Sequence, residues 1–123
     1  MANTEVTRNQ VQFRFGDFIL LPQRASLLKA GHEVKLRPKV YDALLYLLEN
    51  RGRLVPKEEL IQALWPEAFV TDDSLVQCMV ELRRALDDRS QEILKTIPRR
   101  GYIFAAAVNA DAVGAQNISE EKP

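Results

Sequence analysis

The sequence is poor in the residues that disulfide bonding, metal binding and membrane insertion require. Its 123 residues include one cysteine, Cys78, and one histidine, His32. A single cysteine excludes an internal disulfide framework and a cysteine-rich metal site. The longest apolar runs, such as residues 18–22, fall far short of the roughly 20 residues that span a bilayer. Residues 1–10 are polar and differ from the apolar core of a secretory signal peptide, which favours a cytoplasmic location.

Signatures of catalysis are also missing from the chain. There is no glycine-rich phosphate-binding loop, no HExxH motif and no paired metal-ligand spacing. His32 falls in an expected hairpin loop, and Cys78 falls on the apolar side of its helix, where a thiol packs as a small apolar group. We therefore expect no enzyme activity, no catalytic residue, no cofactor, no metal and no small-molecule substrate.

The chain lacks an excess of charge of either sign. Its 17 lysines and arginines balance 17 aspartates and glutamates, so the formal net charge is zero. A neutral total argues against nucleic acid, whose partners usually carry a positive surplus. The balance is uneven, however, because residues 109–123 hold three acidic residues and one lysine, whereas residues 93–108 are locally basic. The zero therefore does not by itself exclude DNA as a partner.

The length and the hydrophobic fraction of 46% are those of one globular domain. Residues 11–108 carry the patterned part of the sequence, and we expect an α+β fold there. The flanking segments are polar or consist of small residues. We therefore expect a disordered lead-in over residues 1–10 and a flexible tail or linker over residues 109–123.

Short apolar runs broken by turn residues fill residues 11–36. Residues 11–15 alternate between apolar and polar side chains, a Gly-Asp turn follows, and residues 18–21 form a second run. Residues 26–29 and 33–36 flank a loop that contains glycine, which is a hairpin signal. The pattern predicts an N-terminal four-stranded antiparallel sheet.

From Pro38 the apolar spacing becomes helical. The predicted helices cover residues 38–50, 56–65 and 72–87, and Pro38 suits the first turn of the first helix. Two strand patterns follow within residues 93–107, joined by the basic tip Pro98-Arg99-Arg100-Gly101. The chain is therefore predicted to end its domain with a β-hairpin.

The third predicted helix has one apolar face and one mixed face. At about 100° per residue, one line along the helix holds Leu75, Met79, Leu82 and Leu86, which predicts the core side. A mixed face on an isolated helix is more often simply solvated. The order helix, loop, helix and basic hairpin is nevertheless that of a winged helix-turn-helix. In that fold the second helix of the pair enters the major groove, and the wing reaches the neighbouring backbone.

Residues 36–104 resemble the OmpR/PhoB-type winged-helix domain of bacterial transcription regulators. The segments that carry the resemblance are Leu36-Arg37-Pro38, residues 54–60, Leu64-Trp65, residues 82–86 and residues 101–104. Residues 70–75 and 97–102 are closer to the CadC/ToxR-like branch. The resemblance implies a four-stranded N-terminal sheet, three helices and a wing. It also implies sequence-specific binding of double-stranded DNA in signal transduction or a phosphorelay, in the cytoplasm or as the cytoplasmic part of a membrane-anchored regulator.

By this resemblance the third helix is the recognition helix, and its outward positions contact DNA. These positions are Ser74, Gln77, Val80, Glu81 and Arg84. Gln77 could pair with adenine, Val80 could touch a thymine methyl, and Arg84 could reach guanine or a phosphate. Glu81 could accept a hydrogen bond from cytosine or hold Arg84 in an i,i+3 ion pair, and helix geometry favours the ion pair.

Contacts to DNA phosphates need only charge and reach. Two arginines at a turn are usually just a solvated tip, but in this topology the tip meets the DNA backbone. A cation at the start of the second helix and hydroxyl groups on the wing strands suit the same role. The residues expected to contact phosphates are Lys57, Thr96, Arg99, Arg100 and Tyr102.

The loop between the second and third helices is an expected protein contact. In the family that the chain resembles, this loop is associated with RNA polymerase, and its positions here include Pro66, Glu67, Phe69 and Val70. Phe69 is expected either to be exposed to a partner or to fold back into the core. The resemblance also implies a tandem dimer on repeated DNA half-sites.

The alternative function is a winged-helix module for protein–protein interaction that does not bind DNA. The zero net charge favours it, as do the acidic residues Asp72, Asp73 and Glu81 around the recognition helix. A salt-insensitive protein complex, together with the absence of DNA binding, would distinguish this alternative.

Overall fold

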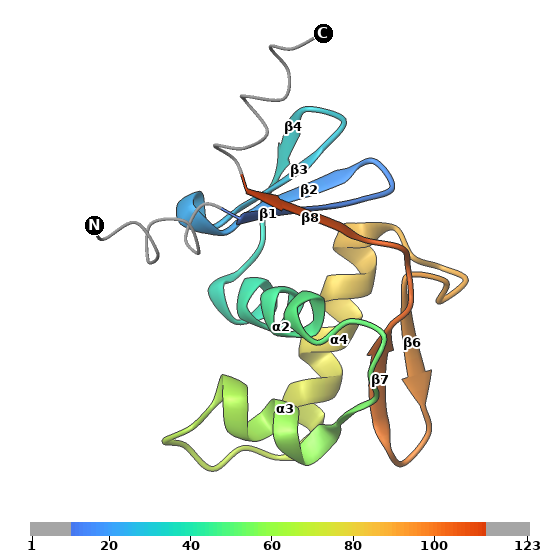
Figure 1. The fold of residues 1–123 in the computed structure, drawn as a ribbon. Helices are drawn as coiled ribbons and strands as arrows, with labels where there is room; N and C mark the ends of the chain where they lie inside the picture. The colour runs from blue at the N-terminus through green and yellow to red at the C-terminus, as the bar shows by residue number, and fades with distance from the viewer. Residues whose placement is uncertain (1–10, 113–123) are drawn as a thin grey trace, which may run out of the picture. The chain divides into compact units, whose positions relative to one another are not determined.

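The computed structural model describes residues 11–112 (Figure 1). It is an α+β fold, so the predicted fold class is confirmed. The expectations for residues 1–10 and for the tail beyond residue 112 lie outside the described residues. The described chain divides into two compact units, one made of residues 11–35 and 107–112 and the other of Leu36–Ala106. No helix within these residues is long and apolar enough to cross a membrane.

The first unit is an antiparallel sheet. Within the described residues its strand order is β4-β3-β2-β1-β8. Phe13 and Phe15 of β1 are buried, and the rings of Phe15 and Phe18 stack with their centroids 5.3 Å apart. The four predicted strands are present, with the short 3-10 helix η1 (Pro22–Arg24) after the second. They are β1 (Val11–Phe15), β2 (Phe18–Leu21), β3 (Ser26–Lys29) and β4 (His32–Val34).

A fifth strand of this sheet is not foreseen by the sequence pattern. Residues 109–112, predicted as the start of a flexible tail, form β8 (Asn109–Ala112), which pairs antiparallel with β1. The tail prediction is wrong for these residues because backbone pairing along β1 needs no apolar alternation, and small residues show none. His32, predicted to lie in a hairpin loop, is instead the first residue of β4 and pairs with Lys29.

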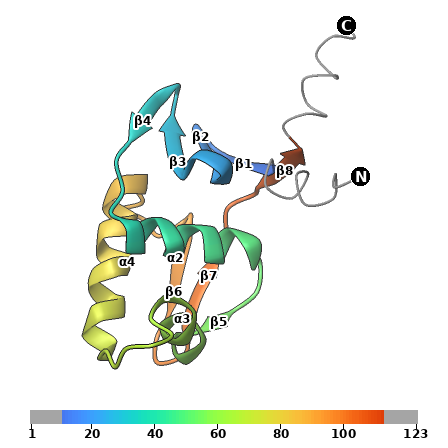
Figure 2. The ribbon, with the colours of Figure 1, turned by 90° about the vertical axis from the view of Figure 1, so that its left-hand side faces the viewer.

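The second unit folds around a helical core. Arg37 is extended and Pro38 takes the first helical position, where its missing N–H costs nothing. Helix α2 packs against α4, α3 and β7 (Figure 2). Each helix of this unit lies within one residue of its predicted bounds; they are α2 (Pro38–Glu49), α3 (Lys57–Leu64) and α4 (Asp72–Leu86). The predicted core side of α4 is confirmed, since no more than 2% of each residue is exposed at Leu75, Met79, Leu82 and Leu86.

The wing is a three-stranded sheet rather than the predicted two-stranded hairpin. Within residues 36–106 its order is β5-β7-β6, with β5 at Val55–Pro56, β7 at Gly101–Phe104 and β6 at Leu94–Ile97. Strand β5 escapes a search for periodicity because two residues show none. Pro56, predicted as the first residue of a helix, lies in this strand and caps α3. Gly101 permits the pairing, since a Cβ there would lie 2.0 Å from the carbonyl oxygen of Val55.

The loop from α4 to β6 is fixed by a buried carboxylate. Asp88 is 5% exposed and accepts hydrogen bonds from three backbone N–H groups. These are the N–H groups of Glu92 at 2.9 Å, Ile93 at 3.1 Å and Leu94 at 2.8 Å. Hydrogen bonds to a charged acceptor are the strong ones. Asp88 therefore ties the end of α4 to the start of β6.

Candidate nucleic-acid interface

The mixed face of α4 is solvent-accessible. Gln77 and Arg84 are exposed, whereas Ser74 is half-buried. Val80 is 38% exposed and Val76, one turn earlier, is 47% exposed. Exposed valines on a helix leave apolar surface in water. This face therefore combines an amide, two apolar side chains and one cation along a 15-residue helix.

The structure corrects the predicted partner of Glu81. Its carboxylate Oε1 accepts a hydrogen bond from Nε of Arg37 at 3.0 Å. Arg37 precedes α2, and the packing of α2 against α4 brings its guanidinium to Glu81. The predicted i,i+3 pair with Arg84 is therefore wrong, because a neighbouring helix supplies a nearer cation. Within residues 11–112, Arg84 forms no ion pair.

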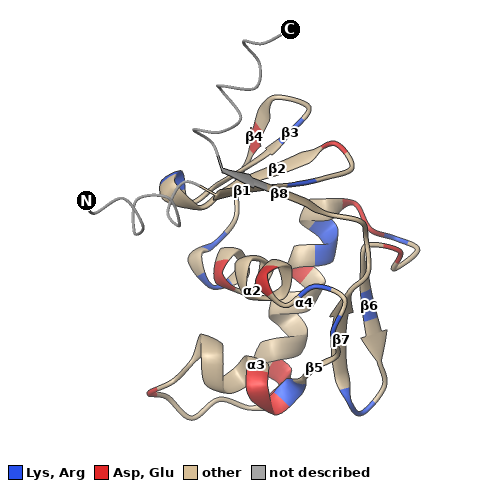
Figure 3. Ribbon diagram, viewed as in Figure 1, with Lys and Arg blue, Asp and Glu red and all other residues tan. Residues whose placement is uncertain are grey.

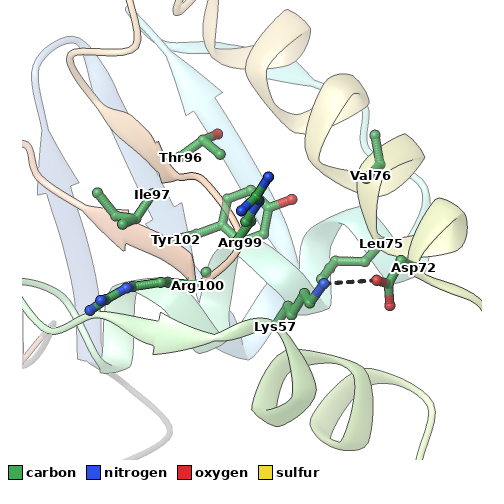
Figure 4. Close-up of a pocket in the computed structure, with 10 residues that line it drawn as sticks. Lys57, Asp72, Leu75, Val76, Thr96, Ile97, Arg99, Arg100 and Tyr102 are labelled. Atoms are coloured by element: carbon green, nitrogen blue, oxygen red, sulfur yellow. Dashed lines mark hydrogen bonds and ion pairs between the residues drawn. The ribbon is translucent and has the colours of Figure 1, made fainter.

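A groove of about 160 Å³ lies between the first turns of α4 and the wing (Figure 4). It brings together side chains from the start of α3, the start of α4, the wing strands β6 and β7 and the turn between them. The groove contains every residue that the sequence predicted to contact phosphates. Its polar lining consists of Lys57, Asp72, Thr96, Arg99, Arg100 and Tyr102.

The wing tip is joined to the start of α3 by backbone hydrogen bonds. The N–H of Arg100 donates to the carbonyl of Ile97 at 2.9 Å and closes the turn. The N–H of Lys57 donates to the carbonyl of Arg100 at 3.2 Å. Arg99 adopts a left-handed conformation with φ of 66°. These contacts place two exposed arginines beside Lys57, and Figure 3 shows basic residues at this tip.

Lys57 has a partner that the sequence did not reveal. Its Nζ lies 2.9 Å from Oδ2 of Asp72, the first residue of α4. The hydrogen bond to Asp72 is the main cause of a raised pKa at Lys57. Lys57, which the sequence predicts to contact a DNA phosphate, therefore already forms an ion pair with a carboxylate in the absence of DNA.

Arg83 is a positioning residue that sequence reasoning missed. Its Nη2 donates to the carbonyl of Leu94 at 3.0 Å and also to the hydroxyl of Thr96. Arg83 thereby connects α4 to β6. Its neighbour Arg84 lies on the exposed face. In the sequence, only the rotation of about 100° between consecutive helical residues distinguishes the two arginines.

Tyr102 lies in the floor of the groove. It is 8% exposed, and burial is the main cause of a raised pKa at its hydroxyl. A protonated hydroxyl can donate a hydrogen bond. Tyr102 can therefore act as a donor to an anion that enters the groove.

The loop between α3 and α4 presents an aromatic side chain. Phe69 is 106% exposed, so its side chain lies in solvent rather than folding back into the core. A groove of about 380 Å³ lies beside it and includes Ile61, Trp65 and Val70. The ring of Trp65 is covered by the ammonium of Lys39, whose Nζ lies 5.6 Å from the ring centroid.

The described residues offer no cluster of three or more histidine, cysteine, aspartate or glutamate side chains that could hold a metal ion. Cys78 is 3% exposed, and its thiol donates a hydrogen bond to the carbonyl of Lys39 at 3.6 Å. Burial is the main cause of a rise in its pKa to about 11. The thiol is therefore a packing group of the α2–α4 contact.

A helix-turn-helix pair followed by a β-sheet wing defines the winged helix-turn-helix class. Residues 31–104 match the family described as transcriptional regulatory protein, C terminal. Because this match covers more than half of the chain, the protein belongs to that family.

The relatives of the chain include two larger transcription regulators. Transcriptional regulator HilA of Salmonella typhi is 38% identical over 94 residues, which cover 76% of this chain and 17% of HilA. Transcriptional activator CadC of Escherichia coli K12 is 28% identical over 92 residues, which cover 72% of this chain and 18% of CadC. The chain thus spans less than a fifth of either relative.

Solved structures show the same fold. The structure described as the DNA-binding domain of E. coli CadC superposes with a TM-score of 0.71 at 27% identity, over 82% of this chain and 97% of that one. The DNA-binding domain of E. coli CpxR gives a TM-score of 0.68 at 26% identity, over 78% of this chain and 98% of that one. The predicted winged-helix architecture is therefore confirmed.

Proposed function

We propose that the protein binds double-stranded DNA sequence-specifically as part of a bacterial transcription regulator, without catalysis. Helix α4 lies in the major groove, and the wing contacts the phosphate backbone or the minor groove. The observation that carries this proposal is the groove in which Lys57, Arg99 and Arg100 meet beside the exposed face of α4. The solved relatives described as DNA-binding domains support it.

Base contacts come from the exposed face of α4. Gln77 pairs with adenine, Val80 contacts a thymine methyl, Arg84 donates to guanine or a phosphate, and Ser74 contacts the nearest base or phosphate. Each good base contact contributes about 1–3 kcal/mol of discrimination. Arg37 already holds the carboxylate of Glu81 in an ion pair. A hydrogen bond from cytosine to Glu81 therefore requires that the two share this carboxylate.

Phosphate contacts come from the groove and the wing tip. Arg99 and Arg100 are exposed cations, Tyr102 and Thr96 provide hydroxyls, and Lys57 adds an ammonium group. If the three cations neutralise about three phosphates, the logarithm of affinity falls with the logarithm of salt concentration with a slope near −3.

The loop between α3 and α4 serves as a contact for RNA polymerase. The full exposure of Phe69 supports this role, because an aromatic side chain that leaves the core suits a partner surface. Pro66, Glu67 and Val70 belong to the same contact. Two copies bind in tandem to repeated half-sites in the cytoplasm. Membership in a family of transcription regulators disfavours the alternative of a protein-interaction module without DNA binding.

Selection of bound sites from a random duplex library tests the proposal. We expect enrichment of one sequence, and the spacing of repeats within it reports whether two copies bind together. A gel-shift titration at low salt, where even non-specific binding is strong, is the stricter test. Absence of any shift with every fragment would overturn the proposed function.

A further inference from the structure

The groove between α4 and the wing contains a hydroxyl that can donate to an anion. Tyr102 is 8% exposed and lines the groove. Within residues 11–112 the fully buried hydroxyl without a partner is that of Tyr41, so the hydroxyl of Tyr102 is open to the groove. An anionic oxygen in the groove can accept a hydrogen bond from it.

The ammonium group of Lys57, which lines the groove, already forms an ion pair with a carboxylate. Figure 4 shows the Lys57–Asp72 pair on one side of the groove and the side chain of Arg100 directed away from it. The side chains of Lys57 and Asp72 are 35% and 62% exposed. An exposed ion pair is weak, so a phosphate can exchange with Asp72 on Lys57.

We propose that Asp72 weakens DNA binding, because its carboxylate competes with a DNA phosphate for Lys57. This inference rests on the proposed DNA binding. The Lys57–Asp72 pair has no net charge, so it gives little attraction to DNA of arbitrary sequence. Any duplex whose phosphate binds Lys57 must first break this pair, whatever its sequence. Asp72 therefore lowers the affinity for random-sequence DNA and for the operator alike.

The test measures binding of a fluorescein-labelled duplex of random sequence by anisotropy over a salt titration, with the selected operator measured in parallel. Asp72→Asn frees the charge of Lys57. We expect affinity for the random duplex to rise about three- to tenfold at low salt. One additional cation steepens the salt slope by about 0.9. Affinity for the operator rises at least as much, because the operator complex also has to break the Lys57–Asp72 pair.

Asp73→Asn is the matched control. Asp73 is exposed in the same turn and, within residues 11–112, forms no ion pair. Its substitution removes the same charge without freeing Lys57. We expect Asp72→Asn to exceed it, and we expect that excess to vanish in a Lys57→Met background. Thermal unfolding of each variant verifies that the helix is retained.

Equal effects of the two substitutions would overturn the inference, as would an excess that persists in the Lys57→Met background. Unchanged affinity of Asp72→Asn for both duplexes would overturn it too. The two proposals fail separately. If the unsubstituted protein binds no DNA at low salt, the proposed function is wrong; if it binds and Asp72→Asn behaves like Asp73→Asn, only the competition by Asp72 is wrong.

Discussion

Arg83 on α4 donates two hydrogen bonds to the backbone carbonyl of Leu94 on β6, from Nη2 at 3.0 Å and from Nε at 3.3 Å. The first strand of the wing is thus held by the same helix that carries the proposed base contacts. Arg83 is directed to the wing, whereas its neighbour Arg84 lies on the exposed face of α4. The position of the wing, which carries the proposed phosphate contacts, relative to α4 depends on these hydrogen bonds.

Arg83→Ala should weaken DNA binding although Arg83 contacts no DNA. The half-buried guanidinium satisfies a backbone carbonyl, so we expect a loss of about 1–3 kcal/mol in the free energy of unfolding. A wing that must be ordered on binding should lower DNA affinity about three- to tenfold. Urea denaturation and fluorescence anisotropy measure the two effects. Arg89→Ala is the control, since Arg89 is exposed and its ion pair within residues 11–112 is with Asp87 at 3.4 Å. If Arg83→Ala behaves like Arg89→Ala in both assays, the link has no role.

Asp88→Ala should be one of the most damaging substitutions on the chain. It leaves the backbone N–H groups of residues 92–94 without the buried carboxylate that accepts from all three. We expect a loss of about 2–4 kcal/mol in the free energy of unfolding, measured by urea denaturation. Glu92→Ala, an exposed acidic residue in the same loop, should change stability by less than about 0.5 kcal/mol. Comparable losses in the two variants would contradict the assigned role of Asp88.

The helices and the core side of α4 could be predicted from sequence because apolar spacing records burial directly. Leu75 and Leu82 are apolar at helical intervals, and burial of both follows from that spacing. Strands β5 and β8 could not be predicted in this way. Val55–Pro56 is too short to show a period, and Asn109–Ala112 pairs through its backbone.

The ion pairs of the interface were beyond prediction for a different reason. Glu81 has Arg84 within reach on its own helix, yet it pairs with Arg37, which is 44 residues away along the chain. Lys57 likewise meets Asp72 across the turn between two helices. Residue spacing along one helix identifies only the possible partners on that helix. The packing of the helices decides which cation lies nearest to a carboxylate. The residues that line the groove between α4 and the wing were nevertheless named from sequence, because the topology brings their segments together.

Glu59 should make stability depend on pH in the acid range. Arg53 donates to both of its carboxylate oxygens, at 3.1 Å from Nη1 and 2.8 Å from Nη2, and Tyr46 donates its hydroxyl. The hydrogen bonds from Arg53, followed by that from Tyr46, lower the pKa of Glu59 from 4.5 to about 2. A depressed pKa in the folded state stabilises the protein above about pH 4.5, and the stabilisation is lost as the pH falls towards 2. The unfolding midpoint of the unsubstituted protein should exceed that of Glu59→Gln at pH 7 and converge with it near pH 2. A difference that does not change with pH would contradict this assignment.

Cys78 should be unreactive in the folded protein. Its pKa of about 11 leaves little thiolate at pH 8, and the side chain is buried against α2. We expect Ellman's reagent to modify Cys78 only as fast as the protein unfolds. In urea the same thiol should react within the dead time of hand mixing. Rapid modification under native conditions would show that the α2–α4 contact opens.

Val80→Ala should abolish sensitivity to one thymine methyl. Val80 keeps 38% of its surface exposed on α4, and the C5-methyl of thymine is the apolar group that the major groove offers. Replacing thymine by uracil removes only this methyl, so each thymine of the selected operator can be tested without changing a hydrogen bond. We expect one such replacement to weaken binding of the unsubstituted protein about fourfold, as burial of one methyl-sized group contributes ~0.8 kcal/mol. Val80→Ala should lose a similar amount on the thymine operator and nothing further on the uracil operator. If the two losses add, Val80 does not contact that methyl, and α4 lies in the groove with another face towards the bases.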